Sequence, residues 1–87
     1  MTIDFTINVW QEGSQCIAHA LPLDIMSSGP TPEGARAAVD EAVRCFLKTA
    51  ADIGTLDQVL EECGFELGNG EWKSPNWIGV QRHAVAV

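Results

Sequence analysis

The sequence predicts an α+β fold in which an antiparallel sheet carries one long helix on one face, with the element order β-β-β-α-α-β. Two patterns predict this class. Apolar and polar residues alternate strictly over residues 2–9, as in a half-buried strand, whereas apolar residues recur every three or four positions over residues 35–50, as in an amphipathic helix. The chain has 87 residues, no internal repeat and no long linker, so we expect a single domain over residues 1–87.

The first two strands are expected to form a hairpin. Turn residues Glu-Gly-Ser at 12–14 separate the strand over residues 2–9 from a second strand over residues 15–21, which Pro22 closes because it lacks an amide hydrogen. The second strand is apolar on both faces, so two phases remain open: the core face carries either Cys16, Ala18 and Ala20 or Ile17, His19 and Leu21. Residues 24–28 form either a short third strand or an extended connector.

A helix-start sequence follows the third segment. Thr31 is expected to be the N-cap, Pro32 occupies the first helical position, and Glu33 places a negative charge in the first turn, where the helix dipole favours it. Small apolar residues lead and large ones follow along the helix, so we expect it to lie close to the sheet at its start. Gly54 is expected to end this helix.

The last third of the chain predicts a second helix and three short extended segments. Thr55 and Gln58 have the spacing of a capping box, and Gly64 followed by Phe65 indicates a Schellman ending. A tight turn over residues 68–70 joins two short strands. Residues 77–87 are expected to form a final strand, which must insert into the sheet or pair with another chain because an apolar unpaired strand would aggregate.

The charge of the chain limits its partners. Twelve acidic and five basic residues give a net charge of −7, which repels phosphate backbones and favours a basic protein partner over nucleic acid, although acidity also serves solubility. Three cysteines without a CxxC motif indicate reduced thiols. Because neither a leader pattern nor an apolar stretch of membrane-spanning length is present, we expect a cytoplasmic protein without a membrane partner.

The residue patterns do not favour catalysis, a metal or another cofactor. Cys16 and His19 are three apart on a strand, so their side chains leave opposite faces and cannot share an ion. Two-metal nuclease chemistry needs converging carboxylates, but Asp4 alternates onto the face away from the one that the helix and its acids Asp40 and Glu41 would cover. The serines before Gly29 lack the pattern of a nucleophile elbow.

Large side chains outside the expected core indicate a subunit interface. Trp10 follows the alternation of the first strand onto its polar face, and Trp77 lies beside a proline turn. Aromatic residues near loops are enriched at interfaces, although such residues also cap small cores. We therefore expect a homo-oligomer whose subunit contact includes Trp10, Ile17, His19 and Trp77.

The hairpin with its Glu12-Gly13 turn, the strand end at Pro22, and the sequence Ser-Gly-Pro-Thr-Pro-Glu-Gly-Ala at residues 28–35 together resemble the HicB-like antitoxin family. The resemblance covers about residues 5–47 and includes the Ala/Val-rich helix that follows. Gly34 stands where the family prefers an acidic residue, and Asp24-Ile25 replaces its Leu-Pro-Gly-like sequence.

The resemblance implies a degenerate RNase H-like β-β-β-α-β core and a dimer or tetramer that neutralises a small basic mRNA-cleaving toxin. Family members usually carry a separate DNA-binding domain, for which residues 65–87 leave no room. The expected electrostatic contacts to a toxin are Asp4, Glu12, Glu33, Asp40 and Glu41. An orphan oligomeric binding module is an alternative within this class. A small metal-dependent nuclease-like enzyme, or a ligand-binding protein with a cleft between subunits, is the alternative from another class.

Overall fold

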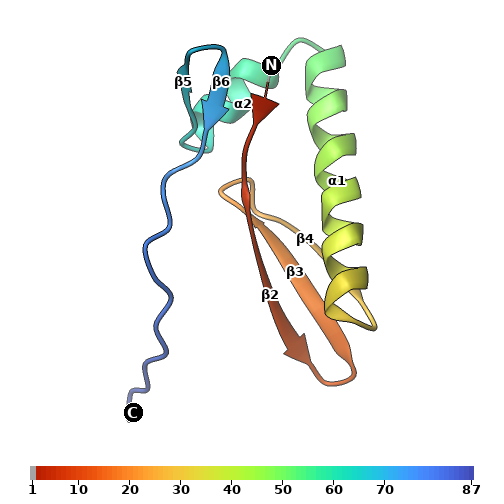
Figure 1. Cartoon of the computed structure of the whole chain (residues 1–87), viewed down its shortest axis with the longest axis vertical. Helices are drawn as coiled ribbons and strands as arrows, with labels where there is room; N and C mark the ends of the chain where they lie inside the picture. Colours follow the sequence, from red (N-terminus) through yellow and green to blue (C-terminus); the bar gives the residue numbers. More distant parts are fainter. Residues whose placement is uncertain (1) are drawn as a thin grey trace.

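The chain folds around a three-stranded antiparallel sheet that carries a long helix on one face (Figure 1). The computed structural model describes residues 2–87. This larger sheet has the order β2-β3-β4, and its strands span Thr6–Glu12, Gln15–Leu21 and Ile25–Gly29. Helix α1 spans Pro32–Asp52 and packs on all three strands. The α+β class and the long helix on an antiparallel sheet are confirmed.

A smaller second sheet stands at one end of the molecule, beside helix α2 (Leu56–Glu62) (Figure 1). Its order is β1-β6-β5, with strands at Thr2–Ile3, Glu71–Lys73 and Glu66–Gly68. Its strand β1 leads directly along the chain into β2 of the larger sheet. Strand β1 runs parallel to β6, and β5 runs antiparallel to it. The predicted order with one strand after the helices was therefore too simple, although the turn at residues 68–70 is confirmed.

The alternating segment at the start of the chain serves both sheets. The predicted single strand over residues 2–9 is wrong, because β1 ends at Ile3 and β2 begins at Thr6. Asp4 lies at the break, where its amide donates to the Trp72 carbonyl at 3.2 Å and its carboxylate accepts from the Ser74 amide at 2.8 Å. These bonds hold the first residues against β6 and leave the next ones free to join β3.

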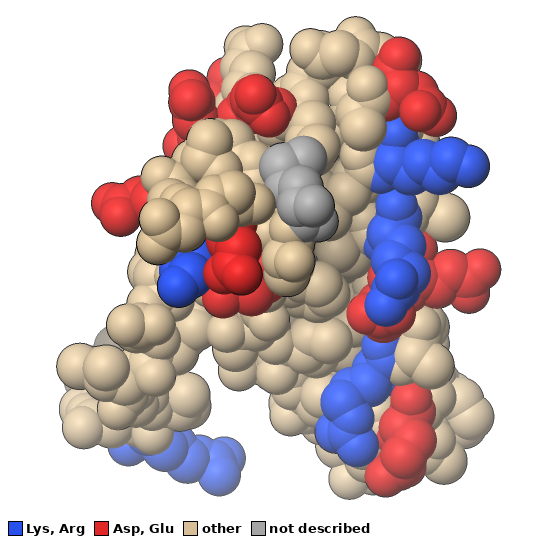
Figure 2. All heavy atoms as spheres, turned by 45° about the horizontal axis from the view of Figure 1, so that its top comes forward, with Lys and Arg blue, Asp and Glu red and all other residues tan. Residues whose placement is uncertain are grey.

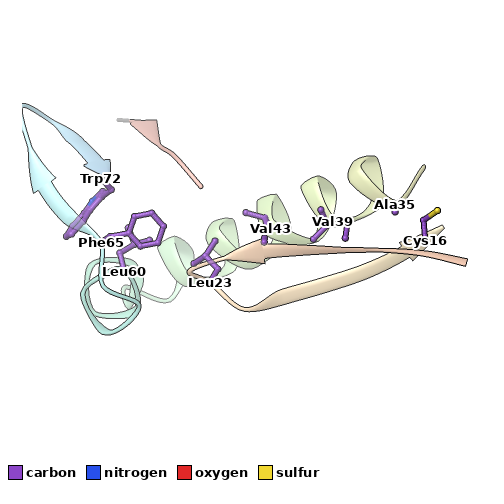
Figure 3. Packing of buried hydrophobic residues seen from close by; sticks show 10 residues of the cluster. Cys16, Leu23, Ala35, Val39, Val43, Leu60, Phe65 and Trp72 are labelled. Atoms are coloured by element: carbon purple, nitrogen blue, oxygen red, sulfur yellow. The ribbon is translucent and has the colours of Figure 1, made fainter. Parts of the chain in front are cut away.

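The inner face of β3 consists of small residues. Cys16, Ala18 and Ala20 are buried against α1, whereas the residues between them face away from the helix and are half-buried. The first of the two phases open from the sequence is therefore the observed one. Figure 3 shows Val39 and Val43 of α1 lying along this small-residue face. Side chains of this size let the helix lie close to the sheet, as the sequence predicts.

A second group of buried side chains closes the end of the molecule that carries α2. Leu60, Phe65 and Trp72 are each at most 4% exposed and lie together in Figure 3, with Leu23 between them and Val43 of α1. Phe65 reaches this group through the predicted Schellman ending: its amide donates to the Leu60 carbonyl at 3.0 Å, and Gly64 has a φ of 92°.

The predicted capping box of α2 is wrong. Thr55 is the N-cap residue, but its hydroxyl donates to the Ala50 carbonyl at 3.4 Å instead of accepting from the new helix. The Gln58 side chain donates from Nε2 to the Glu62 carboxylate at 3.2 Å and does not reach back to Thr55. The Thr55 amide also bonds to Ala50, as part of the turn through Gly54 that ends α1, so this residue is committed to the helix before it.

Residues 77–87 are extended but belong to neither sheet, which contradicts their assignment as a strand within one chain. Figure 1 shows this segment, which we call the tail, running from β6 along the length of the molecule and apart from it. The pairing of β6 ends at Lys73, and Pro75 has no amide hydrogen with which to continue it.

The junction between β4 and α1 combines the predicted cap with a close backbone contact. The Thr31 hydroxyl accepts from the Gly34 amide at 3.0 Å, which confirms Thr31 as the N-cap. Gly29, the last residue of β4, is buried against the first turn of the helix. A Cβ atom on Gly29 would lie 2.8 Å from the Ala35 nitrogen and 2.9 Å from the Gly34 carbonyl carbon. Only glycine fits there without moving the helix.

We expect Gly29→Ala to lower the free energy of unfolding by about 1–3 kcal/mol, because the new methyl group meets backbone atoms that cannot turn aside. Urea denaturation followed by circular dichroism measures this change. Gly68→Ala is the matched control, because a Cβ at Gly68 has nothing within 4 Å, and its effect should stay within about 0.5 kcal/mol. Equal stability of the two variants would contradict the close contact.

Candidate functional site

The face of the larger sheet opposite α1 carries an apolar patch. Trp10 of β2 is the cross-strand partner of Ile17 on β3, and His19 is the partner of Met26 on β4. We call these four residues the outer-face patch. Trp10 is 38% exposed and Met26 is 57% exposed. Trp10, Ile17 and Met26 of the patch line a shallow groove of about 450 Å³, together with Glu12, Ser27 and Ser28.

Polar contacts hold the aromatic side chains of the patch in place. The Trp10 indole Nε1 donates to the Glu12 carboxylate at 3.0 Å, and its ring meets the His19 ring edge-on, with centroids 6.2 Å apart and an interplanar angle of 87°. His19 Nε2 in turn lies 2.6 Å from Asp24 Oδ1. The patch is therefore an ordered apolar surface with a carboxylate at each end.

The structure brings together three of the four residues expected at a subunit interface. Trp10, Ile17 and His19 share the outer-face patch, whereas Trp77 lies on the tail. Met26 and Asp24 belong to the same surface and were missed, because residues 24–28 could be read as either a strand or a connector. The β3–β4 register, which places Met26 beside His19, is the information that the sequence lacked.

The five acidic residues expected to contact a partner do not form one surface. Asp4 is bonded to Ser74 at the junction with the smaller sheet, and only Glu12 lies at the outer-face patch. The remaining three, Glu33, Asp40 and Glu41, belong to α1, which lies on the other side of the larger sheet.

Ion pairs along α1 reduce the acidity of that side. Glu33 is 3.5 Å from the Arg36 guanidinium. The Asp40 carboxylate accepts from Arg44 Nε at 2.7 Å and thereby holds the pKa of the Arg44 guanidinium above its ordinary value. Figure 2 shows Lys and Arg side chains in a row along one side of the molecule, with acidic side chains between them.

Acidic residues are concentrated at the end of the molecule built by α2, β5 and β6, where Lys73 of β6 lies 3.9 Å from Glu71. Residues 52–71 contain six acidic and no basic residues, which we call the acidic end: Asp52, Asp57, Glu61, Glu62, Glu66 and Glu71. Acidic side chains at this end are visible in Figure 2. Sequence reasoning concentrated on the hairpin and α1 and missed this group, although the absence of Lys and Arg between Lys48 and Lys73 would have revealed it.

Among residues 2–87, no three His, Cys, Asp or Glu side chains are arranged to hold a metal ion. Cys16 faces α1 whereas His19 faces outward, as their spacing on one strand predicts. Within the same range, neither helix combines the length and the apolar character needed to cross a bilayer.

Comparison with known proteins identifies no relative: no protein-family model, curated protein or solved structure matches the chain. The resemblance to HicB-like antitoxins therefore rests on residues 5–47 alone. Among the surfaces described above, the outer-face patch combines exposed apolar side chains with side-chain contacts that position Trp10 and His19.

The three thiols differ in environment, so we expect them to react with a disulfide reagent at different rates. Cys45 is exposed on α1 and should react first, whereas Cys16 is buried beneath the helix and should react last. Burial, reinforced by the Glu62 carboxylate, raises the pKa of the Cys63 thiol, so less reactive thiolate is present at pH 8. We expect Cys63 to react about ten-fold more slowly than Cys45 and to accelerate above pH 9.

The absorbance of the thiolate that the disulfide reagent releases, followed over time at pH 8, separates the reactions of the three thiols into kinetic phases. Cys45→Ser is the control variant and should remove the fast phase only. A fast phase that persists in Cys45→Ser would show that Cys63 or Cys16 is more accessible than the structure indicates.

Proposed function

We propose that the protein is a non-catalytic interaction protein of the HicB-like antitoxin type, which binds a small basic RNase toxin and masks its RNA-binding surface. The observation that carries this proposal is the outer-face patch, an apolar surface on the side of the larger sheet that α1 leaves open. Contiguous exposed apolar surface on a small domain is typical of a protein-binding site.

The composition of the patch suits a protein partner. Trp10 is a large aromatic side chain already oriented by Glu12 and His19, so little conformational entropy is lost when a partner covers it. Met26 is a flexible apolar side chain that can adjust to the shape of the partner. Glu12 and Asp24 at the two ends supply acceptors for basic side chains at the rim.

The charge distribution supports a basic partner. The net charge of −7 creates a negative field that attracts cationic proteins and repels RNA. An RNase must itself carry positive charge to bind RNA, so a protein of this charge can compete with the RNA for it. The acidic end adds long-range attraction, whereas the ion-paired side of α1 adds little.

The resemblance supplies the identity of the partner within this proposal. Residues 28–35 and the helix after them are the part of the chain that is similar to HicB-like antitoxins. In this role the protein acts as a homo-oligomer and by contact alone, so it requires no cofactor. A reading frame for a small basic protein beside the gene is the expected source of the partner.

We expect Trp10→Ala to weaken binding of that small basic protein by about 30-fold, because a buried tryptophan anchor contributes about 2 kcal/mol or more. Isothermal titration calorimetry measures the change. Phe46→Ala is the matched control, because Phe46 is also aromatic and is 41% exposed but lies on α1, away from the outer-face patch. The Phe46→Ala variant should bind the small basic protein with the same affinity as the unmodified protein.

Two results would contradict this proposal. One is unchanged affinity in Trp10→Ala together with a loss in Phe46→Ala. The other is divalent-metal-dependent RNA cleavage by the protein alone that disappears in Asp4→Asn, because such activity would show an enzyme.

We expect association with the basic partner to slow as salt concentration rises, because screening weakens the negative field of the acidic end. Stopped-flow measurement of Glu61→Gln/Glu62→Gln should give a several-fold slower association rate at low salt and a small change at high salt. Lys48→Gln is the control of opposite sign and should not slow association. Comparable association rates at low and high salt would contradict electrostatic attraction.

A further inference from the structure

The tail is an extended segment that pairs with no strand among residues 2–87. Ile78, Val80 and Val85 are between 84 and 99% exposed, so the backbone is extended while its apolar side chains remain in water. The structure gives residues 77–87 no backbone hydrogen bond to the rest of the described chain. A segment of this composition gains free energy when a sheet edge accepts it.

The larger sheet has such an edge along β2. Within residues 2–87, β2 pairs only with β3, so one side of Thr6–Glu12 presents unpaired backbone groups. Ile7 and Val9 stand along this edge on the side that faces α1, and both are only partly buried. A further strand beside β2 would cover them and would extend the sheet.

The tail of the same chain does not occupy this edge (Figure 1), and the register of the smaller sheet would leave its last residues beyond β2. In the parallel β1–β6 pair, Thr2 lies opposite Glu71 and Ile3 opposite Trp72, a constant offset of 69 residues. Continued along β2, this offset places Gln81 opposite Glu12, the last residue of the strand. The most apolar part of the tail, residues 84–87, would then project beyond the hairpin turn into water.

We propose that the tail is donated to a second copy of the protein, where it pairs along β2, and that two copies exchange their tails in a symmetric dimer. The eleven residues 77–87 are long enough for the seven residues of β2. An exchanged tail is free of the β1–β6 register, so its apolar end can lie against the sheet. Trp77, placed at the base of the tail, then belongs to the subunit contact.

The charges of the tail and of the body permit pairing with a second copy. Arg82 is the only Lys, Arg, Asp or Glu among residues 74–87, whereas all twelve acidic residues belong to the body that would receive the tail. The tail therefore has no acidic side chain that the acidic domain would repel. This inference does not depend on the basic toxin, because it concerns the edge of the sheet and not its outer face.

Sedimentation equilibrium of the full chain tests the proposal, with Val80→Pro/Val85→Pro as the variant. Alternate amides of an added edge strand point at β2, and residues 80 and 85 are an odd number apart, so in either register one of the two prolines removes an amide donor that the pairing requires. Neither position has a backbone bond within the described monomer. We expect the unmodified protein to be a dimer and the variant to shift toward the 9.4 kDa monomer, with at least about a ten-fold higher dissociation constant. Val80→Thr/Val85→Thr retains the amides and the β-branched shape, so it should remain closer to the unmodified protein.

Nuclear Overhauser effects in a mixture of ¹³C-labelled and unlabelled chains identify the acceptor. Contacts between tail methyl groups of one chain and β2 protons of the other support exchange. A monomeric unmodified protein overturns the proposal, as does a dimer that the prolines leave intact. A tail that contacts β2 only within its own chain also overturns it. Circular dichroism of the proline variant confirms that the body remains folded.

Discussion

The close approach of α1 to the larger sheet is the constraint on which the rest of the structure depends. Gly29 meets the backbone of the first helical turn, and Ala18, Ala20 and Ala35 are completely buried between the two layers. A core made of such small side chains is thin. It holds the helix firmly in register with the strands, but it has no room for bulky residues.

The bulky residues therefore lie outside the layer between α1 and the larger sheet. Trp72 and Phe65 close the end of the molecule near α2, where the smaller sheet makes space for them. Trp10 and Met26 stand on the outer face of the sheet, and Trp77 lies on the tail. A thin core thus accounts for the amount of apolar surface that remains available for binding.

The proposed contacts with the basic partner and with the exchanged tail involve different surfaces of the larger sheet, its outer face and its β2 edge. A basic partner on the outer-face patch would approach perpendicular to the strands, whereas an exchanged tail would add to the edge of β2 within the plane of the sheet. Trp10 belongs to β2 and faces outward, so an added strand would widen the surface beside it. Dimer formation would in this way enlarge the site for the basic partner instead of competing with it.

The sequence alone determined the features that depend on neighbouring residues. The Thr31 cap, the Gly64–Phe65 ending, the turn at residues 68–70 and the amphipathic α1 all follow from bonds or periodicities a few residues long. Only the tertiary structure decided which face of β3 is inside, because both faces are apolar, and where the first strand breaks, because Asp4 bonds to Ser74 seventy residues away. It also decided that Asp24 meets His19 and that the tail pairs with no strand among residues 2–87. These outcomes depend on strand register and on which segments meet, and local residue patterns do not encode either.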